Sequence, residues 1–165
     1  MMNIAIFGGS FNPPHKAHLR LAEEFSKELC ADKMLIIPTC AAPHKDSSQY
    51  ASASDRLAMC RLLFPKDRFE VSELEINRQG KSYTIDTLVS LEKEYPGAKF
   101  YLIIGSDMLL SFHMWFRYED ILSKCTLCVM TRENDISVTQ MRHYVNQTLR
   151  LPDSAVIFHL SAHTR

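Results

Sequence analysis

The sequence predicts an α/β protein of the Rossmann-like, doubly wound kind, with a mainly parallel sheet of five or six strands. Two observations lead to this fold class. Short apolar runs alternate with helical patterns along the chain, as in a parallel sheet whose strands are joined by helical crossovers. The first run, residues 4–7, is continuously apolar, which suits a strand buried on both faces. The 165 residues are expected to form one domain, residues 1–165.

The expected strands are apolar runs that end at glycine, proline or polar residues. The second run, for example, stops at Pro38. In a further extended segment, residues 69–76, the alternation slips by one residue, as at a β-bulge. We expect strands over residues 4–7, 34–37, 69–76, 100–104, 127–130 and 155–158.

The expected helices have apolar residues at helical spacing between start and stop signals. The first begins near Lys16 and buries Leu19, Ala22, Phe25 and Leu29. Serine or threonine caps are expected for the next two. The second helix runs from a cap at Ser52 or Ser54 to Pro65, and the third runs from a Thr84 cap to Pro96. One or two short helices are expected within 108–122 and a last one over 137–149.

Residues 39–54 lack periodicity, and a loop of this length in a compact domain is usually functional or mobile. In doubly wound sheets, ligands bind outside the carboxyl ends of the strands. Polar residues that follow the strands are therefore expected to gather on one rim. They are residues 8–10, 39–45, 105–107 and Arg132.

Composition excludes several classes of function. Nineteen basic residues balance nineteen acidic ones, so no net field attracts nucleic acid or a membrane surface. No apolar run approaches a membrane span, and no signal peptide precedes the first strand. Five scattered cysteines suit reduced thiols in the cytoplasm. Cys125 and Cys128 would point to opposite faces of a strand and lack a second pair, so packing thiols are favoured over zinc ligands.

The first strand and the helix after it have the pattern of an anion site. Gly8 and Gly9 would permit a tight turn and let a ligand approach the backbone. The N-terminus of the following helix supplies N–H groups and a positive dipole end. His15 and His18 are three residues apart and share a face at that end. A glycine pair or one histidine is often structural, but two imidazoles there favour a phosphate site.

The stretch IAIFGGSFNPPHKAH resembles the signature of the nucleotidyltransferase superfamily, of the His-x-Gly-His type. It is neither a P-loop nor the dinucleotide fingerprint. Further motifs occur in the order found in bacterial nicotinate-nucleotide adenylyltransferases, and the resemblance covers nearly the whole chain. They are Ala42-Pro43-His44-Lys45, Ser82-Tyr83-Thr84 with Asp86-Thr87-Leu88, Ile104-Gly105-Ser106-Asp107-Met108-Leu109, and Trp115.

This resemblance implies an enzyme of NAD biosynthesis that joins ATP and nicotinate mononucleotide to give deamido-NAD and pyrophosphate. Mg²⁺ would be carried mainly by the ATP phosphates, with no dedicated protein cage. Phosphopantetheine adenylyltransferase or another small nucleotidyltransferase is the enzymatic alternative, and a nucleotide-binding module without catalysis is the other. The oligomeric state stays open, a homo-oligomer being one option.

The resemblance also implies roles for individual residues. His15 and His18 would be the catalytic pair that stabilises charge on the departing pyrophosphate. Trp115 would stack its indole on the pyridine ring of the mononucleotide, core packing being the alternative. Lys45 and Thr84 would also bind the mononucleotide, although a loop lysine is usually just solvated. The ATP-binding residues would be Gly8, Gly9, Ser10, Phe11, Gly105, Ser106, Asp107 and Arg132, the last having an ordinary surface arginine as its alternative.

Three departures from the family pattern stand out. Asn12 takes the place of a frequent Asp and Ala17 that of a frequent Gly, both small changes. The family also carries an Ile-Ser-Ser-Thr-x-Ile-Arg segment after its last strand, opening a helix that holds the ATP phosphates. Here residues 160–165 follow that strand. We therefore expect the chain to lack its C-terminal helical segment, which would weaken ATP binding or activity.

Overall fold

The computed structural model describes residues 1–39, 51–78, 83–131 and 137–160. Six strands form one parallel sheet in the order β3-β2-β1-β4-β5-β6. This order is that of Rossmann-like doubly wound folds, so the predicted fold class is confirmed. The strands are β1 (Asn3–Gly9), β2 (Lys33–Pro38), β3 (Glu70–Val71), β4 (Lys99–Gly105), β5 (Cys125–Thr131) and β6 (Val156–Leu160).

Helical segments separate the strands close to the predicted positions. Several of the helical segments after β4 are short, and two of these are 3₁₀ helices. The α-helices are α1 (Lys16–Glu28), α2 (Ala53–Leu63), α3 (Thr84–Glu94), α4 (Ser106–Leu109), α5 (Tyr118–Lys124) and α6 (Val138–Gln147), and the 3₁₀ helices are η1 (Phe112–Met114) and η2 (Asp153–Ala155). Among the residues that the structure describes, no helix has the length and apolar character needed to cross a membrane.

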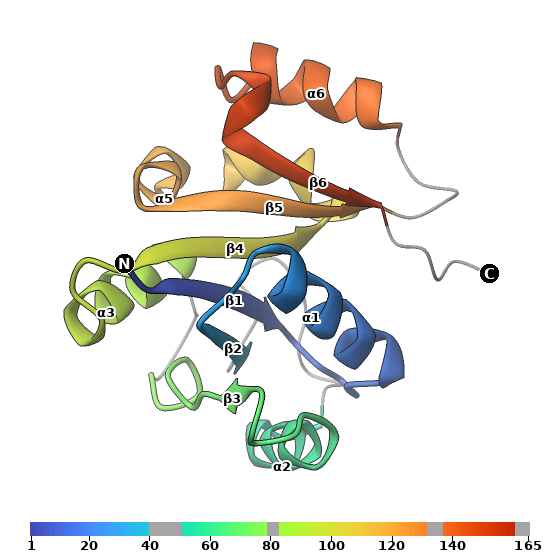
Figure 1. The fold of residues 1–165 in the computed structure, drawn as a ribbon, viewed down its shortest axis with the longest axis vertical. Helices are drawn as coiled ribbons and strands as arrows, with labels where there is room; N and C mark the ends of the chain where they lie inside the picture. Colours follow the sequence, from blue (N-terminus) through green and yellow to red (C-terminus); the bar gives the residue numbers. More distant parts are fainter. Residues whose placement is uncertain (40–50, 79–82, 132–136, 161–165) are drawn as a thin grey trace. The chain divides into compact units, whose positions relative to one another are not determined.

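The chain divides into two compact units, Met1–Phe100 and Tyr101–Arg165. In the first unit, β1 pairs in parallel with β2, and β2 with β3 (Figure 1). The central residues of β1 and β2 are fully buried, as predicted for a strand covered on both faces. Helices α1, α2 and α3 bury their apolar stripes, including Leu21, Ala22, Phe25, Leu57, Cys60, Ile85, Leu88 and Leu91.

In the second unit, β5 pairs in parallel with β6, from Leu127 opposite Val156 onward. Helix α6 buries Met141, Tyr144 and Val145. The Tyr144 hydroxyl accepts the backbone N–H of His113 at 2.9 Å, and so holds the η1 turn. The core of this unit is therefore built from the strand and helix patterns that the sequence predicts.

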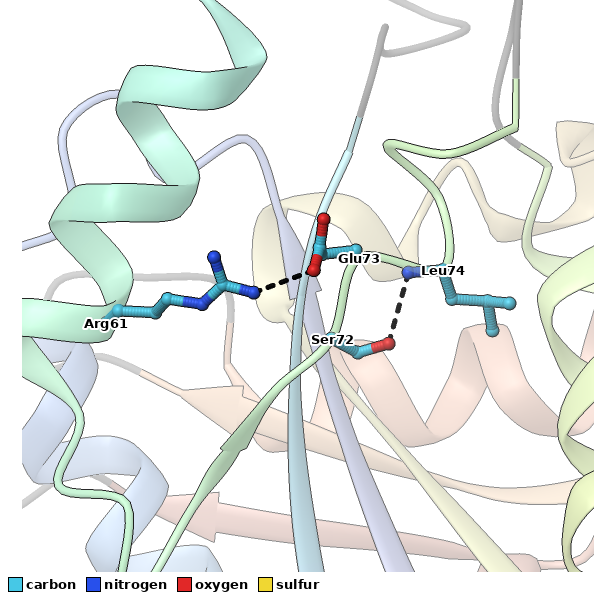
Figure 2. A network of polar contacts seen from close by, with 4 residues as sticks. All are labelled: Arg61, Ser72, Glu73 and Leu74. Carbon is cyan, nitrogen blue, oxygen red and sulfur yellow. Dashed lines mark hydrogen bonds and ion pairs between the residues drawn. The ribbon is translucent and has the colours of Figure 1, made fainter.

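Two local predictions are wrong. The segment 69–76 is extended only at Glu70–Val71, and residues 74–76 form a turn. The Ser72 hydroxyl accepts the Leu74 backbone N–H at 3.2 Å, while Arg61 pairs with Glu73 at 2.9 Å (Figure 2). Such a short-range side-chain bond competes with strand pairing.

The other wrong prediction concerns helix capping. Thr84 is the first residue of α3 and Tyr83 is its N-cap, so Thr84 does not cap that helix. Ser52 does cap α2 as expected, because its hydroxyl accepts the Asp55 backbone N–H at 3.0 Å.

Candidate active site

The two glycines of the signature end a strand and do not form a turn. Gly8 and Gly9 are the last residues of β1, in register with Ile37 and Pro38. Neither has a positive φ, so the predicted tight turn at this position is wrong. A Cβ built on either glycine would meet its nearest neighbour at 3.8 Å and 3.6 Å, which are ordinary contacts. The described residues around this strand end therefore do not themselves demand glycine there.

The chain bends instead at Phe11, whose φ of 47° lies in the left-handed region. A bulky residue rarely adopts this conformation, and surrounding contacts must hold it. The Phe11 ring is buried and makes edge-to-face contacts with Phe7, Phe64 and the imidazole of His18 at 5.5, 6.1 and 5.1 Å between centroids. Since its side chain belongs to the core, the predicted ATP contact would fall to its backbone.

His15 and His18 lie together at the N-terminus of α1. Their rings stack with centroids 3.8 Å apart and planes 25° apart. His15 is the N-cap residue, and its backbone N–H donates to Nδ1 of His18 at 3.0 Å. Because Nδ1 accepts this bond, a neutral His18 ring carries its proton on Nε2. The arrangement makes Nε2 a hydrogen-bond donor.

The helix end that carries these rings suits an anion. Helix α1 has thirteen residues and no acidic residue in its first turn. The backbone N–H of His18 donates to the His15 carbonyl at 2.9 Å, and the helix dipole places partial positive charge at this end. The Phe11 ring connects this end to β1, since it contacts His18 and lies 3.6 Å from a Cβ built on Gly9. The imidazoles and the end of β1 thus share one neighbourhood.

Arg56 is a buried residue of this region that the sequence analysis missed. It lies on α2 and is 2% exposed. Its guanidinium donates to the backbone carbonyls of Ser10, Thr39 and Ala51. The only sequence signal was its position four residues before Cys60, on the same helix face, and arginine at such a position is usually exposed.

A second buried polar cluster supports the start of α3, where the predicted substrate residue Thr84 lies half-buried. The Thr87 hydroxyl donates to the buried carboxylate of Glu75 at 2.6 Å. Arg78 in turn donates to that hydroxyl at 3.2 Å. Of these residues, only Thr87 lies in a motif of the family resemblance, Asp86-Thr87-Leu88. Glu75 and Arg78 lie in none, and their side chains meet Thr87 only in the folded chain.

In the second unit, Gly105, Ser106 and Asp107 follow one another at the end of β4 and the start of α4. Ser106 is buried, whereas Asp107 is exposed. A Cβ built on Gly105 would lie 2.6 Å from the Asp107 carboxylate oxygen Oδ1. Glycine at 105 therefore leaves the space into which the Asp107 side chain folds back.

Trp115, also in the second unit, is half-buried and follows the η1 turn. Its indole packs on Phe112, with centroids 4.7 Å apart. This contact accounts for part of the indole surface, so stacking on a pyridine ring stays a prediction.

The remaining predicted residues, Lys45 and Arg132, lie outside the described residues, as does Ser82 of the Ser-Tyr-Thr motif. Among the residues that the structure does describe, no group of three histidine, cysteine or acidic side chains could hold a metal ion.

Comparison with known proteins relates this geometry to a family. Residues 6–158 match the model of the cytidylyltransferase-like family. The chain belongs to the cytidylyltransferase-like family. The match extends from β1 to β6 and includes the glycine pair, both histidines and the end of β4.

Within this family, the relatives of the chain carry a more specific name. A protein of Pelobacter propionicus named probable nicotinate-nucleotide adenylyltransferase is 47% identical over 133 residues, covering 79% of this chain and 61% of the relative. A Listeria monocytogenes protein of the same name is 41% identical over 130 residues, covering 78% of this chain and 69% of the relative. The resemblance inferred from the motifs is thereby confirmed. The chain spans 61% of the length of the Pelobacter relative.

A solved structure shares the fold. Nicotinic acid mononucleotide adenylyltransferase of Plasmodium falciparum, in a complex with NaAD, matches with a TM-score of 0.76 at 18% identity. The match covers 98% of this chain and 75% of that chain. At this identity the likeness concerns the fold, and it agrees with the strand order described above.

Proposed function

We propose that the chain is a nicotinate-nucleotide adenylyltransferase that joins ATP and nicotinate mononucleotide to give deamido-NAD and pyrophosphate, a step of NAD biosynthesis. The observation that carries the proposal is the pair of stacked imidazoles at the start of α1, beside the end of β1. The names of the relatives supply the substrates, and the geometry supplies an anion site of the kind that a triphosphate needs.

The reaction we propose is an in-line displacement. A phosphate oxygen of nicotinate mononucleotide attacks the α-phosphorus of ATP, and the bond from that phosphorus to the pyrophosphate oxygen breaks. Transfers of this kind depend mainly on positioning and on stabilising charge. The Nε2–H of His18 would donate to the phosphate oxygens on which charge develops, and the imidazole of His15 would support the same group. No covalent intermediate with the protein is required.

The other assignments complete the proposal. The backbone at Gly8, Gly9, Ser10 and Phe11 would pass close to the ATP phosphates, which would explain two glycines that the fold does not demand. Gly105, Ser106, Asp107 and Arg132 would bind ATP. Lys45, Thr84 and Trp115 would bind the mononucleotide. Mg²⁺ would arrive on the ATP phosphates and neutralise part of their charge. The exposed Asp107 carboxylate would contact either the ribose or a water of that ion. A cytoplasmic location stays a prediction, and the oligomeric state stays open.

The test is a product assay. The purified chain is incubated with ATP and Mg²⁺ and, in separate reactions, with nicotinate mononucleotide, nicotinamide mononucleotide or phosphopantetheine. Pyrophosphate release is measured and the product is identified by mass spectrometry. We expect deamido-NAD. Product with phosphopantetheine alone would reassign the substrate, and ATP binding without product from any acceptor would support a nucleotide-binding module.

A further inference from the structure

Arg56 joins three segments of the first unit at one point. Its Nη1 donates to the carbonyl of Ser10 at 2.8 Å and to that of Thr39 at 2.7 Å. Its Nε donates to the carbonyl of Ala51 at 3.0 Å. One side chain thus holds the residue after β1, the residue after β2 and the residue before the cap of α2. A buried guanidinium requires such partners, because an unsatisfied charge away from water is costly.

The bond to Ser10 fixes the direction of a neighbouring donor. In a trans peptide unit, the carbonyl and the following N–H point in opposite directions. Since the Ser10 carbonyl faces Arg56, the Phe11 N–H faces away from it. Arg56 therefore determines which way the first peptide after β1 presents its donor.

The same bond supports a strained conformation. Phe11 has a φ of 47°, which a phenylalanine adopts only under constraint. Its ring is held by aromatic neighbours, and the peptide on its N-terminal side is held by Arg56. A further bond, from the Ala51 N–H to Oδ1 of Asn12 at 2.9 Å, ties the loop to the segment that Arg56 also binds. Both ends of the bend are thus fixed.

We propose that Arg56 is a positioning residue, which sets the backbone of residues 10–12 in the conformation that receives the ATP phosphates and does not itself touch the substrate. This inference rests on the proposed function for the identity of the ligand. Arg56 acts through backbone carbonyls, so its loss should alter ATP binding and turnover without altering the mononucleotide site.

The test compares two arginines of the same helix. Arg56→Met keeps the length and apolar stem but removes every donor. Arg61→Met is the matched control, because Arg61 also lies on α2 but is exposed and pairs with Glu73 at the surface (Figure 2). Three quantities are measured for each variant: the melting temperature, the Kd for ATP, and hydrogen exchange of the peptide that covers residues 8–12. Turnover adds kcat and the separate KM values for ATP and the mononucleotide.

For Arg56→Met we expect the Kd or KM for ATP to rise and kcat to fall, each at least tenfold. The KM for the mononucleotide should stay within twofold, and exchange should rise at least tenfold in residues 8–12 but not in α6. Arg61→Met should match the wild type. Arg56→Lys keeps the positive charge but replaces the planar guanidinium by an ammonium group. This variant should fold and recover only part of the lost ATP affinity and turnover.

Other outcomes would overturn the inference. It fails if Arg56→Met folds and binds ATP as the wild type does with unchanged exchange, or if both KM values rise together. Should Arg56→Met not fold, Arg56→Lys decides: wild-type ATP affinity, or a failure to fold as well, makes Arg56 purely structural. A wild-type chain that binds ATP but transfers no adenylyl group would refute the proposed function alone, because ATP affinity and exchange still report the role of Arg56.

Discussion

Nδ1 of His18 accepts the backbone N–H of His15 at 3.0 Å, so the backbone of one histidine fixes the tautomer and orientation of the other. The bond serves two purposes that can be separated. It closes the first turn of α1, as a side chain at the third helical position does in a capping box. It also leaves Nε2 as the donor toward a phosphate.

Substitutions at His18 distinguish the two purposes. In His18→Asn, the amide oxygen can replace Nδ1 as acceptor, but nothing replaces Nε2–H. We expect a melting temperature near that of the wild type and a loss of turnover of about a hundredfold or more, the usual effect of removing one preorganised donor. His18→Gln, which places an amide near Nε2, should retain more turnover than His18→Asn. Steady-state kinetics and thermal unfolding provide the comparison, and equal turnover of His18→Asn and wild type would remove His18 from the mechanism.

Gly9→Ala should separate stability from ligand binding. A Cβ there meets only ordinary contacts and Gly9 has no positive φ, so the change should leave stability unchanged or raise it by about 0.4–1 kcal/mol. If ATP passes close to this backbone, ATP affinity should fall at least tenfold. Gly97→Ala is the control, because Gly97 has a φ of 80° and open space around it. It should lose about 1 kcal/mol of stability with no change in ATP affinity. Unaltered ATP affinity in Gly9→Ala would exclude a close backbone approach.

Trp115 can be tested by its own fluorescence, because it is the single tryptophan of the chain. If the indole stacks on the pyridine ring, nicotinate mononucleotide should quench its emission in a saturable titration. Trp115→Ala should raise the KM for the mononucleotide at least tenfold and leave the KM for ATP within twofold. Phe116→Ala, at an exposed neighbouring ring, is the matched control and should change neither. Core packing alone would instead lower the melting temperature of Trp115→Ala without shifting the KM.

Two thiols, at the buried Cys60 and the half-buried Cys125, predict a loss of stability at alkaline pH. Burial raises the pKa of Cys60 from 9.0 to about 11 and that of Cys125 to about 12. Well below pH 9 both thiols are protonated whether the chain is folded or unfolded. Above pH 9 the unfolded chain releases these protons and the folded chain keeps them, so the free energy of unfolding falls as pH rises.

Urea unfolding between pH 8 and 10.5 measures this effect. The Cys60→Ala/Cys125→Ala double variant should lose much of the slope above pH 9. Cys30→Ala, which removes an exposed thiol, should retain it. An identical slope in the double variant and the wild type would show that other groups cause the alkaline destabilisation.

Most of the fold could be predicted because each buried parallel strand has a local sequence pattern, a continuous apolar run such as residues 34–37. The short length of β3 could not, since the Ser72 hydroxyl accepts the backbone N–H of Leu74, two residues on, where the strand has ended. The glycine pair misled for a related reason. Gly8 and Gly9 are permissive for a turn, yet pairing with β2 keeps them extended.

The part of the candidate site that could be predicted is the part that depends on the spacing of residues in the sequence. Three residues of separation on a helix place His15 and His18 together, and their rings do stack. The bend at Phe11 and the burial of Arg56 depend on contacts between distant segments. A sequence reading assigns phenylalanine a negative φ and arginine an exposed position, and only tertiary packing reverses both.

The central claim, that the His18 imidazole receives the ATP phosphates through Nε2, is tested most directly by NMR of ¹⁵N-histidine-labelled protein. The chain is titrated with Mg²⁺ and a non-hydrolysable ATP analogue, and His18 is assigned by loss of its signals in His18→Gln. We predict that Nδ1 of His18 keeps the shift of an unprotonated acceptor while Nε2 and its proton shift in proportion to bound analogue. Saturation with the analogue that leaves both His18 nitrogens unmoved would contradict the account.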